Sequence, residues 1–150
     1  VQCLAKLLPT PLDLFCRFFM PAKLIVRRNN KFELRHSGYD REMNVPFLSG
    51  CFMFLRMSTL KETGLFDERY FMYAEDFDLT RRIHRNYRTL FFPQVSIYHK
   101  FSRGSHRSLR LFFAHTISMM RYFCKFGWFY DSERRHFNRR ILDEIKEMQG

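Results

Sequence analysis

The segment that most limits the fold of this chain is 76–85, in which charged side chains are sorted by position. Acids stand at its start and bases at its end (Glu75, Asp76, Asp78; Arg81, Arg82, His84, Arg85). A helix dipole stabilises acids near the N-terminus and bases near the C-terminus. We therefore expect a helix from about Asp76 to Arg85, with Asn86 as its C-cap.

Apolar segments flank this helix on both sides. Residues 47–55 are mainly apolar and aromatic, and their length and aromatic content favour a buried strand. Residues 89–98 predict a strand pair, or one strand kinked at Pro93. Ser58 is expected to cap a short helix over 59–63, which Gly64 ends in a left-handed conformation.

The N-terminal part alternates apolar and polar segments. Residues 13–19 predict a short amphipathic helix between two prolines, Pro11 and Pro21. Residues 27–46 are polar and charged, which indicates an exposed loop or hairpin.

Two helices are expected at the C-terminal end. Residues 109–126 predict an amphipathic helix, and residues 133–148 a charged one. The side chains available for one face of the first helix are Phe112, Ile117, Met120 and Phe123. No internal repeat or boundary divides residues 1–150, so we expect a single unit.

Composition excludes some classes of protein and leaves others open. A hydrophobic fraction of 46% excludes a disordered polymer. The net charge of +11 predicts an anionic partner, which could be a nucleotide, a phospholipid head group or nucleic acid. No apolar run reaches the roughly 20 residues of a membrane span. The four cysteines lack metal-ligand spacing, so we expect reduced, mostly buried thiols in a cytosolic protein (Cys3, Cys16, Cys51, Cys124).

The adjacent acids Glu75 and Asp76 are the first candidate site. They follow three aromatic residues (Tyr70, Phe71, Tyr73). Partial burial under aromatic rings is expected to raise the pKa of one acid while the helix dipole holds the other ionised, a combination that permits base chemistry. The alternative is that both acids only complement the helix dipole.

His99 and the basic residues after it form the second candidate site. His99 directly follows an apolar segment, where a histidine can be a metal ligand, a base or a structural residue. Lys100, Arg103 and Ser105 surround Gly104 in a loop that suits a diphosphate, although a solvated basic turn would look the same. Aromatic and basic residues over 121–130 favour either a membrane interface or a packed core.

Taken in order, several segments resemble the rhamnosyltransferase-like branch of family 2 glycosyltransferases. The matching segments are Ser49-Gly-Cys-Phe-Met-Phe-Leu-Arg56, Gly64-Leu-Phe-Asp-Glu-Arg-Tyr-Phe-Met-Tyr-Ala-Glu-Asp-Phe-Asp-Leu79, Arg81-Arg82, Tyr87-Arg88, Phe92-Pro93 and His99. The resemblance covers residues 47–108. It implies an α/β fold, the C-terminal portion of a GT-A (Rossmann-like) domain, with residues 109–150 as additional C-terminal helices.

The resemblance also implies an activity and roles for the candidate residues. The enzyme would transfer a sugar, with inversion, from a nucleotide-diphosphate sugar to a glycan or lipid-linked acceptor in cell-surface polysaccharide biosynthesis. Asp76 would be the catalytic base, and Glu75 would bind the acceptor with Ser49 and Gly50 beside it. His99 would complete a Mg²⁺ or Mn²⁺ site, and the diphosphate-binding residues would be Lys100, Arg103 and Ser105.

The chain departs from the family in one large respect. No Asp-x-Asp occurs before residue 47, so the nucleotide-binding half is expected to be absent and the chain to be inactive alone. The expected location is cytoplasmic, peripheral at the inner face of the plasma membrane, without nucleic acid as a partner. Two non-enzymatic alternatives stay open. One is a basic aromatic module for an anionic membrane or nucleic acid, and the other is a remnant that pairs with another subunit. The sequence does not define the oligomeric state.

Overall fold

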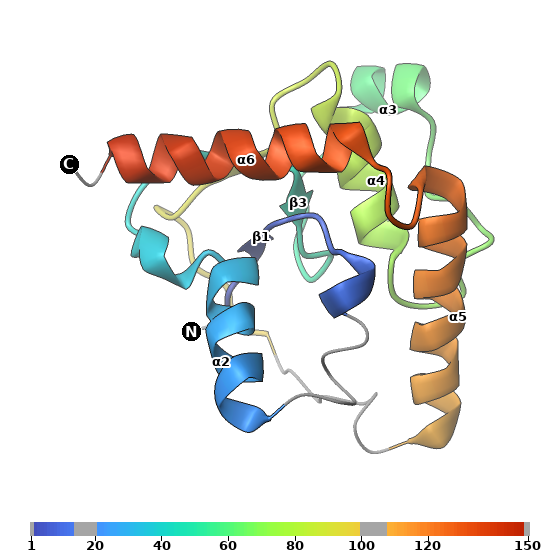
Figure 1. Ribbon diagram of the computed structural model, residues 1–150. Coiled ribbons are helices and arrows are strands. Elements are labelled where there is room, and N and C mark those ends of the chain that lie inside the picture. The colour runs from blue at the N-terminus through green and yellow to red at the C-terminus, as the bar shows by residue number, and fades with distance from the viewer. Residues whose placement is uncertain (1, 14–20, 100–107, 149–150) are drawn as a thin grey trace.

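The computed structural model describes residues 2–13, 21–99 and 108–148, which form a mixture of helices and small antiparallel sheets (Figure 1). Strand β1 (Ala5–Lys6) pairs with β3 (Phe47–Leu48), and β2 (Met43–Asn44) pairs with β4 (Leu90–Phe91). The helices are α2 (Ala22–Phe32), the 3-10 helix η1 (Arg35–Ser37), α3 (Met57–Thr63), α4 (Glu75–His84), α5 (Leu109–Phe126) and α6 (Ser132–Glu147). This agrees with an α/β class.

Helix α4 lies at the centre of the molecule and confirms the helix expected from the sorted charges. It lies beside β3, where the rings of Phe77 and Phe47 stack 3.8 Å apart. Its C-cap is Arg85, in right-handed conformation, and Asn86 has no positive φ. The prediction of Asn86 as the C-cap was therefore wrong.

The short helix α3 and its glycine end are confirmed with one correction. Gly64 has a φ of 84°, which favours a residue without a side chain. Ser58 lies inside the helix, and Arg56 occupies the N-cap position. The carbonyls of Thr63, Gly64 and Leu65 at the end of α3 accept hydrogen bonds from Arg82. The arginine thus satisfies carbonyls that the helix end leaves unpaired.

Both expected strands are much shorter than predicted. Residues after Leu48 leave the sheet, and Phe52 and Phe54 are exposed. The chain turns at Gly50 because its N–H donates to the side chain of Asp76 on α4. Within 89–98 only Leu90–Phe91 form a strand, and it pairs with β2.

The loop predicted over 27–46 is partly a helix. Helix α2 continues to Phe32 and has no buried residue, so its polar residues suit an exposed helix as well as they suit a loop. Arg28 ties it to residues 10–13 through Asp13 and Thr10. Of the helix predicted over 13–19, only Asp13 lies within the described residues.

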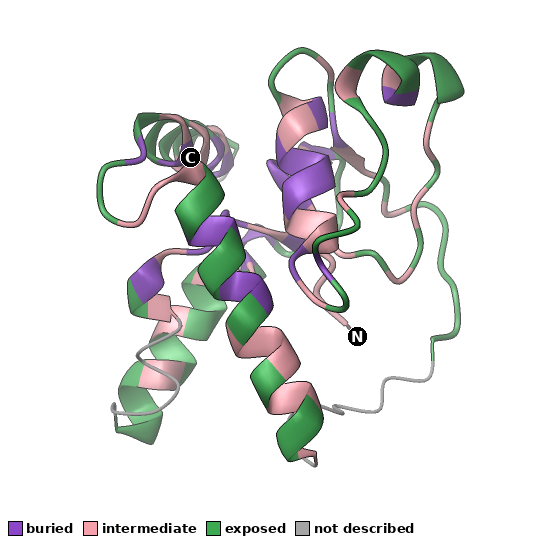
Figure 2. Cartoon of the chain, turned by 90° about the vertical axis from the view of Figure 1, so that its right-hand side faces the viewer, coloured by how far each residue is buried: buried purple, intermediate pink, exposed green. Residues whose placement is uncertain are grey.

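Among the described residues, three apolar clusters form the core, and Figure 2 shows where buried residues lie along the helices and strands. Helix α5 has the predicted bounds, but of the four residues predicted for its packed face only Phe123 is buried. Tyr122 and Phe123 are buried, whereas Ile117 and Met120 are exposed. In α6, Asp131 is the N-cap and accepts from the Arg134 N–H at 2.9 Å.

The cysteines differ from expectation in their burial. Cys3 and Cys51 are half-buried free thiols, and Cys124 is exposed. Cys16 lies outside the described residues. Within the described part of the chain, none of the helices is both long and apolar enough to span a bilayer.

Candidate active site

The backbone that leads into α4 is strained. Tyr73 and Ala74, the two residues before Glu75, both have a φ of 66°, in the left-handed region. Such a conformation costs a residue with a side chain about 1 kcal/mol or more, and it persists only where surrounding packing holds it. Here Ala74 is fully buried, and the Tyr73 ring packs edge-on against His115, 5.1 Å between centroids. The strain lies directly beside the two acids.

Asp76 joins the start of α4 to the turn after β3. One carboxylate oxygen accepts the Gly50 N–H at 2.9 Å, and the other accepts the Phe77 N–H at 2.9 Å. A Cβ at position 50 would lie 3.3 Å from the Cβ of Asp76, so a glycine permits this close approach. The structure therefore brings together Gly50 and Asp76, two of the residues proposed from the sequence.

The pKa of Asp76 is raised above its ordinary value by burial. The hydrogen bonds from Gly50 and Phe77 and the charge of Lys6 act in the opposite direction but do not cancel burial. Burial therefore opposes the stabilisation of the ionised form that was expected from the helix start. A carboxylate with a raised pKa accepts a proton more readily.

Glu75 is the second acid of the site whose pKa is raised. Burial raises its pKa, and the neighbouring charge of Asp76 raises it further. Its Oε2 atom is buried and has no hydrogen-bond partner among the described residues. A buried acceptor that lacks a donor costs free energy, so this oxygen is suited to a hydroxyl from a bound ligand.

Ser49 and Lys6 complete the immediate surroundings. The Ser49 N–H donates to the Leu4 carbonyl at 2.9 Å, which holds the turn beside β1. Lys6 in β1 acts on Asp76 through its charge, and it also pairs with Glu33 at 3.7 Å. Lys6 was not proposed from the sequence, since nothing local marks a lysine 70 positions away as a neighbour of Asp76.

His99 lies by the same N-terminal segment. It is exposed, and its Nδ1 atom is 3.2 Å from Oε1 of Gln2. Across residues 2–13, 21–99 and 108–148, no cluster of three His, Cys, Asp or Glu side chains is arranged to hold a metal. Those residues alone therefore do not form a metal site around His99. Lys100, Arg103 and Ser105 lie outside the described residues.

The remaining charged residues of α4 serve the fold. Asp78 is fully buried between Arg82, at 2.8 Å, and Lys125. Arg81 is buried and forms a bidentate pair with Asp131 at 2.6 and 2.8 Å, together with a 2.7 Å pair to Glu133. These pairs fasten α4 to α5 and α6 and leave only the first two acids for chemistry.

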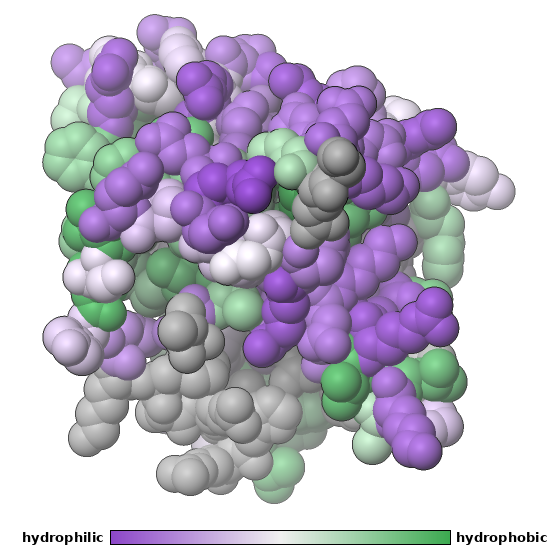
Figure 3. Space-filling model, turned by 90° about the vertical axis from the view of Figure 1, so that its left-hand side faces the viewer, coloured by the Kyte–Doolittle hydropathy of each residue, from purple (hydrophilic) through white to green (hydrophobic). Residues whose placement is uncertain are grey.

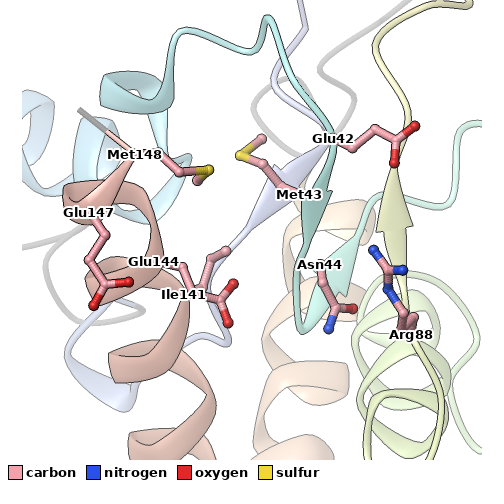
Figure 4. Close-up of a pocket in the computed structure, with 8 residues that line it drawn as sticks. All are labelled: Glu42, Met43, Asn44, Arg88, Ile141, Glu144, Glu147 and Met148. Carbon is pink, nitrogen blue, oxygen red and sulfur yellow. The ribbon is translucent and has the colours of Figure 1, made fainter. Parts of the chain in front are cut away.

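A cavity of about 340 Å³ opens elsewhere, between α6 and the β2–β4 sheet (Figure 4). Its lining includes three acids and one arginine (Glu42, Glu144, Glu147, Arg88). It shares no residue with the site at Asp76, and Glu144 is already paired with Arg140 at 2.9 Å. We do not assign the cavity to the site.

Comparison with known proteins relates part of the chain to a glycosyltransferase. Over 59 residues it is 39% identical to the N-acetylglucosaminyl-diphospho-decaprenol L-rhamnosyltransferase of Mycobacterium tuberculosis, found in two strains. The match covers 39% of this chain and 19% of the relative. No family model matches, and no solved structure matches. The relationship to glycosyltransferases is therefore a coarse one.

Proposed function

We propose that this chain is the acceptor side of an inverting family 2 glycosyltransferase with a GT-A fold, and that Asp76 is its catalytic base. The observation that carries the proposal is the pair of acids at the start of α4. The Asp76 carboxylate is hydrogen-bonded to the Gly50 N–H, and the buried Oε2 atom of Glu75 has no donor among the described residues. The partial match to a rhamnosyltransferase supports the same class of reaction. The donor-binding half would be supplied by residues outside these 150.

In the proposed reaction, Asp76 takes the proton of the acceptor hydroxyl. The acceptor oxygen then forms a bond to the anomeric carbon of the donor sugar. The bond from that carbon to the nucleotide diphosphate breaks on the opposite side, and the diphosphate leaves with the electron pair. Two backbone N–H groups fix the carboxylate, so little reorganisation is needed when the proton arrives.

Glu75 would bind the acceptor sugar. Its buried Oε2 atom can accept a hydroxyl hydrogen bond from the acceptor, which would supply the donor that this oxygen lacks. Ser49 and Gly50 would form the floor of the same subsite, because they follow β3 directly and contact Leu4 and Asp76.

The name of the relative supports a proposal for the substrate class. Its name gives a lipid-linked N-acetylglucosaminyl diphosphate as acceptor and L-rhamnose as the sugar transferred. We propose an acceptor of the same chemical class, a nucleotide-diphosphate donor, and action at the inner face of the plasma membrane. His99 would hold Mg²⁺ or Mn²⁺, and the diphosphate would be bound by Lys100, Arg103 and Ser105. No step above depends on the metal.

The test is sugar transfer by the complete gene product carrying Asp76→Asn. Loss of the base should lower the transfer rate by about 10²–10⁴-fold while donor binding stays nearly intact. Glu68→Gln, a change at an exposed acid eight positions earlier, is the matched control and should retain normal transfer. Near-normal turnover by Asp76→Asn would show that the base is another residue.

The metal assignment has its own test. His99→Ala should weaken the Mn²⁺ dependence of donor binding, measured by metal titration at fixed donor concentration. An unchanged titration would remove His99 from the metal site without affecting the role of Asp76.

A further inference from the structure

Helix α5 has an apolar face that points away from the molecule. Leu109, Phe113, Ile117 and Met120 are exposed by 78%, 59%, 48% and 47%. Their spacing of four, four and three residues puts them on one side of a helix. A different side of α5 packs against the core, through Met119, Tyr122 and Phe123. In Figure 2, α5 is in front and exposed residues recur along its length.

Basic side chains border this outward face of α5. Arg110 lies one turn from Phe113, and Arg121 lies one turn from Ile117. The whole of α5 contains no Asp or Glu. An exposed apolar stripe with bases along one edge, on a helix without acids, is typical of a helix that lies in the surface of a membrane.

The segment before the proposed active site extends this surface. Arg121 donates to the Arg69 carbonyl, and the Ser118 hydroxyl donates to the Met72 carbonyl at 2.7 Å. Residues 69–72 therefore lie against the side of α5, where Phe71 and Met72 are exposed. Met72 is three positions before Glu75, so this apolar surface ends close to the two acids in the sequence.

We infer that the outward face of α5, together with Phe71 and Met72, docks on an anionic membrane surface. Acidic lipid head groups would neutralise Arg110 and Arg121 while the apolar side chains enter the acyl boundary. A second copy of α5 fits less well, because two such faces would bring arginines together without an acid on either helix. The side of the molecule where α6 ends is different, since hydrophilic residues cover most of its upper part (Figure 3).

Helix α5 would lie along the membrane instead of crossing it. Its 18 residues span about 27 Å, and none of the helices in the described ranges could span a bilayer. This docking goes beyond the transfer reaction, since vesicle binding needs neither donor nor acceptor. Only its consequence rests on the proposed function: a lipid-linked acceptor would meet Glu75 and Asp76 at the edge of the docked surface.

The experiment is cosedimentation of the 150-residue chain with lipid vesicles. One set is phosphatidylcholine, and the other contains about one-third phosphatidylglycerol, which supplies the anionic charge. The wild-type chain should bind the anionic vesicles more strongly, and added salt should weaken the binding. The double variant Phe113→Ser and Ile117→Ser should lose about tenfold in partitioning, because both replaced side chains enter the lipid.

Matched control variants distinguish binding through the α5 surface from nonspecific binding to the vesicles. Phe92→Ser with Val95→Ser removes an apolar pair of similar exposure, 47% and 62%, away from α5, and should bind normally. Arg110→Glu should weaken anionic binding more than Arg135→Glu, the same charge change at an exposed position of α6. Circular dichroism checks that each variant is folded. If the apolar α5 variant unfolds, the comparison of vesicle binding by Arg110→Glu and Arg135→Glu tests the inference.

Two results would overturn the inference. One is equal vesicle binding by an α5 variant and its matched control, whether the apolar double variants or the two Arg→Glu variants are compared. The other is a dimer that Phe113→Ser with Ile117→Ser dissociates, with no vesicle binding by the wild type, because the occupant would then be a second copy.

Discussion

The carboxyl groups at the two ends of α4 have pKa values shifted in opposite directions. At its start, Glu75 and Asp76 are held at a strained turn, and their pKa values are raised by burial. At its end, Arg81 is buried with Asp131 and Glu133, whose pKa values are lowered because the arginines beside them outweigh burial. A carboxylate whose pKa is raised by burial is costly to ionise, and such carboxylates are typical of functional sites. Asp131 and Glu133, by contrast, pair with arginines that join elements of the fold.

The largest expected effect on stability is at the C-terminal end of α4, where Arg81 pairs with Asp131. Arg81→Met leaves the Asp131 carboxylate buried without its bidentate partner, and should lower the free energy of unfolding by about 3–5 kcal/mol. Arg85→Met is the control, since Arg85 is an exposed partner of Glu133 and its loss should cost about 0–1 kcal/mol. Urea denaturation measures both, and similar costs would refute the contrast between them.

The next effect is at the start of α4. Gly50→Ala puts a methyl group 3.3 Å from the Asp76 Cβ, so the carboxylate must shift. Transfer by the complete gene product should fall by about 10–100-fold, because a misplaced base loses its alignment. Stability should change little, since Gly50 has no positive φ. Full activity with an alanine at position 50 would mean that the close approach is not needed.

His84, near the C-terminal end of α4, tests whether burial there disfavours a charged side chain that has no ion-pair partner among the described residues. Burial lowers the pKa of His84 to about 4, so the folded chain favours the neutral ring. Its contribution to stability is therefore present above the ordinary pKa of 6.5 and is lost as the pH falls toward 4. His84→Gln should flatten the decline in unfolding free energy between pH 7 and pH 5, measured by urea denaturation, and His136→Gln, at an exposed histidine, should not. Equal slopes would contradict the assignment.

The smallest expected effect is on stability at the N-terminal end of α4, where the pKa of Glu75 is raised. The raised pKa of Glu75 means that its contribution to stability is present below the ordinary 4.5 and is lost as the pH rises through the folded value. Glu75→Gln should therefore raise the unfolding free energy at pH 8 by about 0.5 kcal/mol, a small gain because the side chain is only half-buried. Thermal unfolding of this variant beside Glu68→Gln measures it. A clear loss of stability would mean that Glu75 has a structural partner.

The helices could be predicted from the sequence because their signals are local. Sorted charges gave α4 within one residue at each end, and the apolar period together with Gly127 gave the bounds of α5. The strands could not, since the turn at Gly50 depends on Asp76, 26 positions away. The packed face of α5 was predicted only in part for the same reason, since Phe123 is buried but Ile117 and Met120 are exposed. Its period shows apolar residues on two sides, and only packing shows that Tyr122 and Phe123 are the buried ones.

The candidate site shows the same limit. Glu75, Asp76 and Gly50 could be proposed from their resemblance to a family, whereas their contact depends on how β3 and α4 pack. The pairing of Arg81 with Asp131 crosses 50 positions and leaves no local pattern. Asp76 and Asp78 look alike in sequence, and only the structure shows that Asp78 is buried between two cations.

The most direct test of the contrast along α4 is an NMR titration of its carboxyl groups. Carbon chemical shifts of Glu75, Asp76, Asp131 and Glu133 are followed against pH in the folded chain. Glu75 and Asp76 should titrate above their ordinary pKa values of 4.5 and 3.8, and Asp131 and Glu133 should titrate below theirs. A pKa for Asp76 at or below 3.8 would contradict the claim that burial outweighs the hydrogen bonds and the charge of Lys6 at the start of α4.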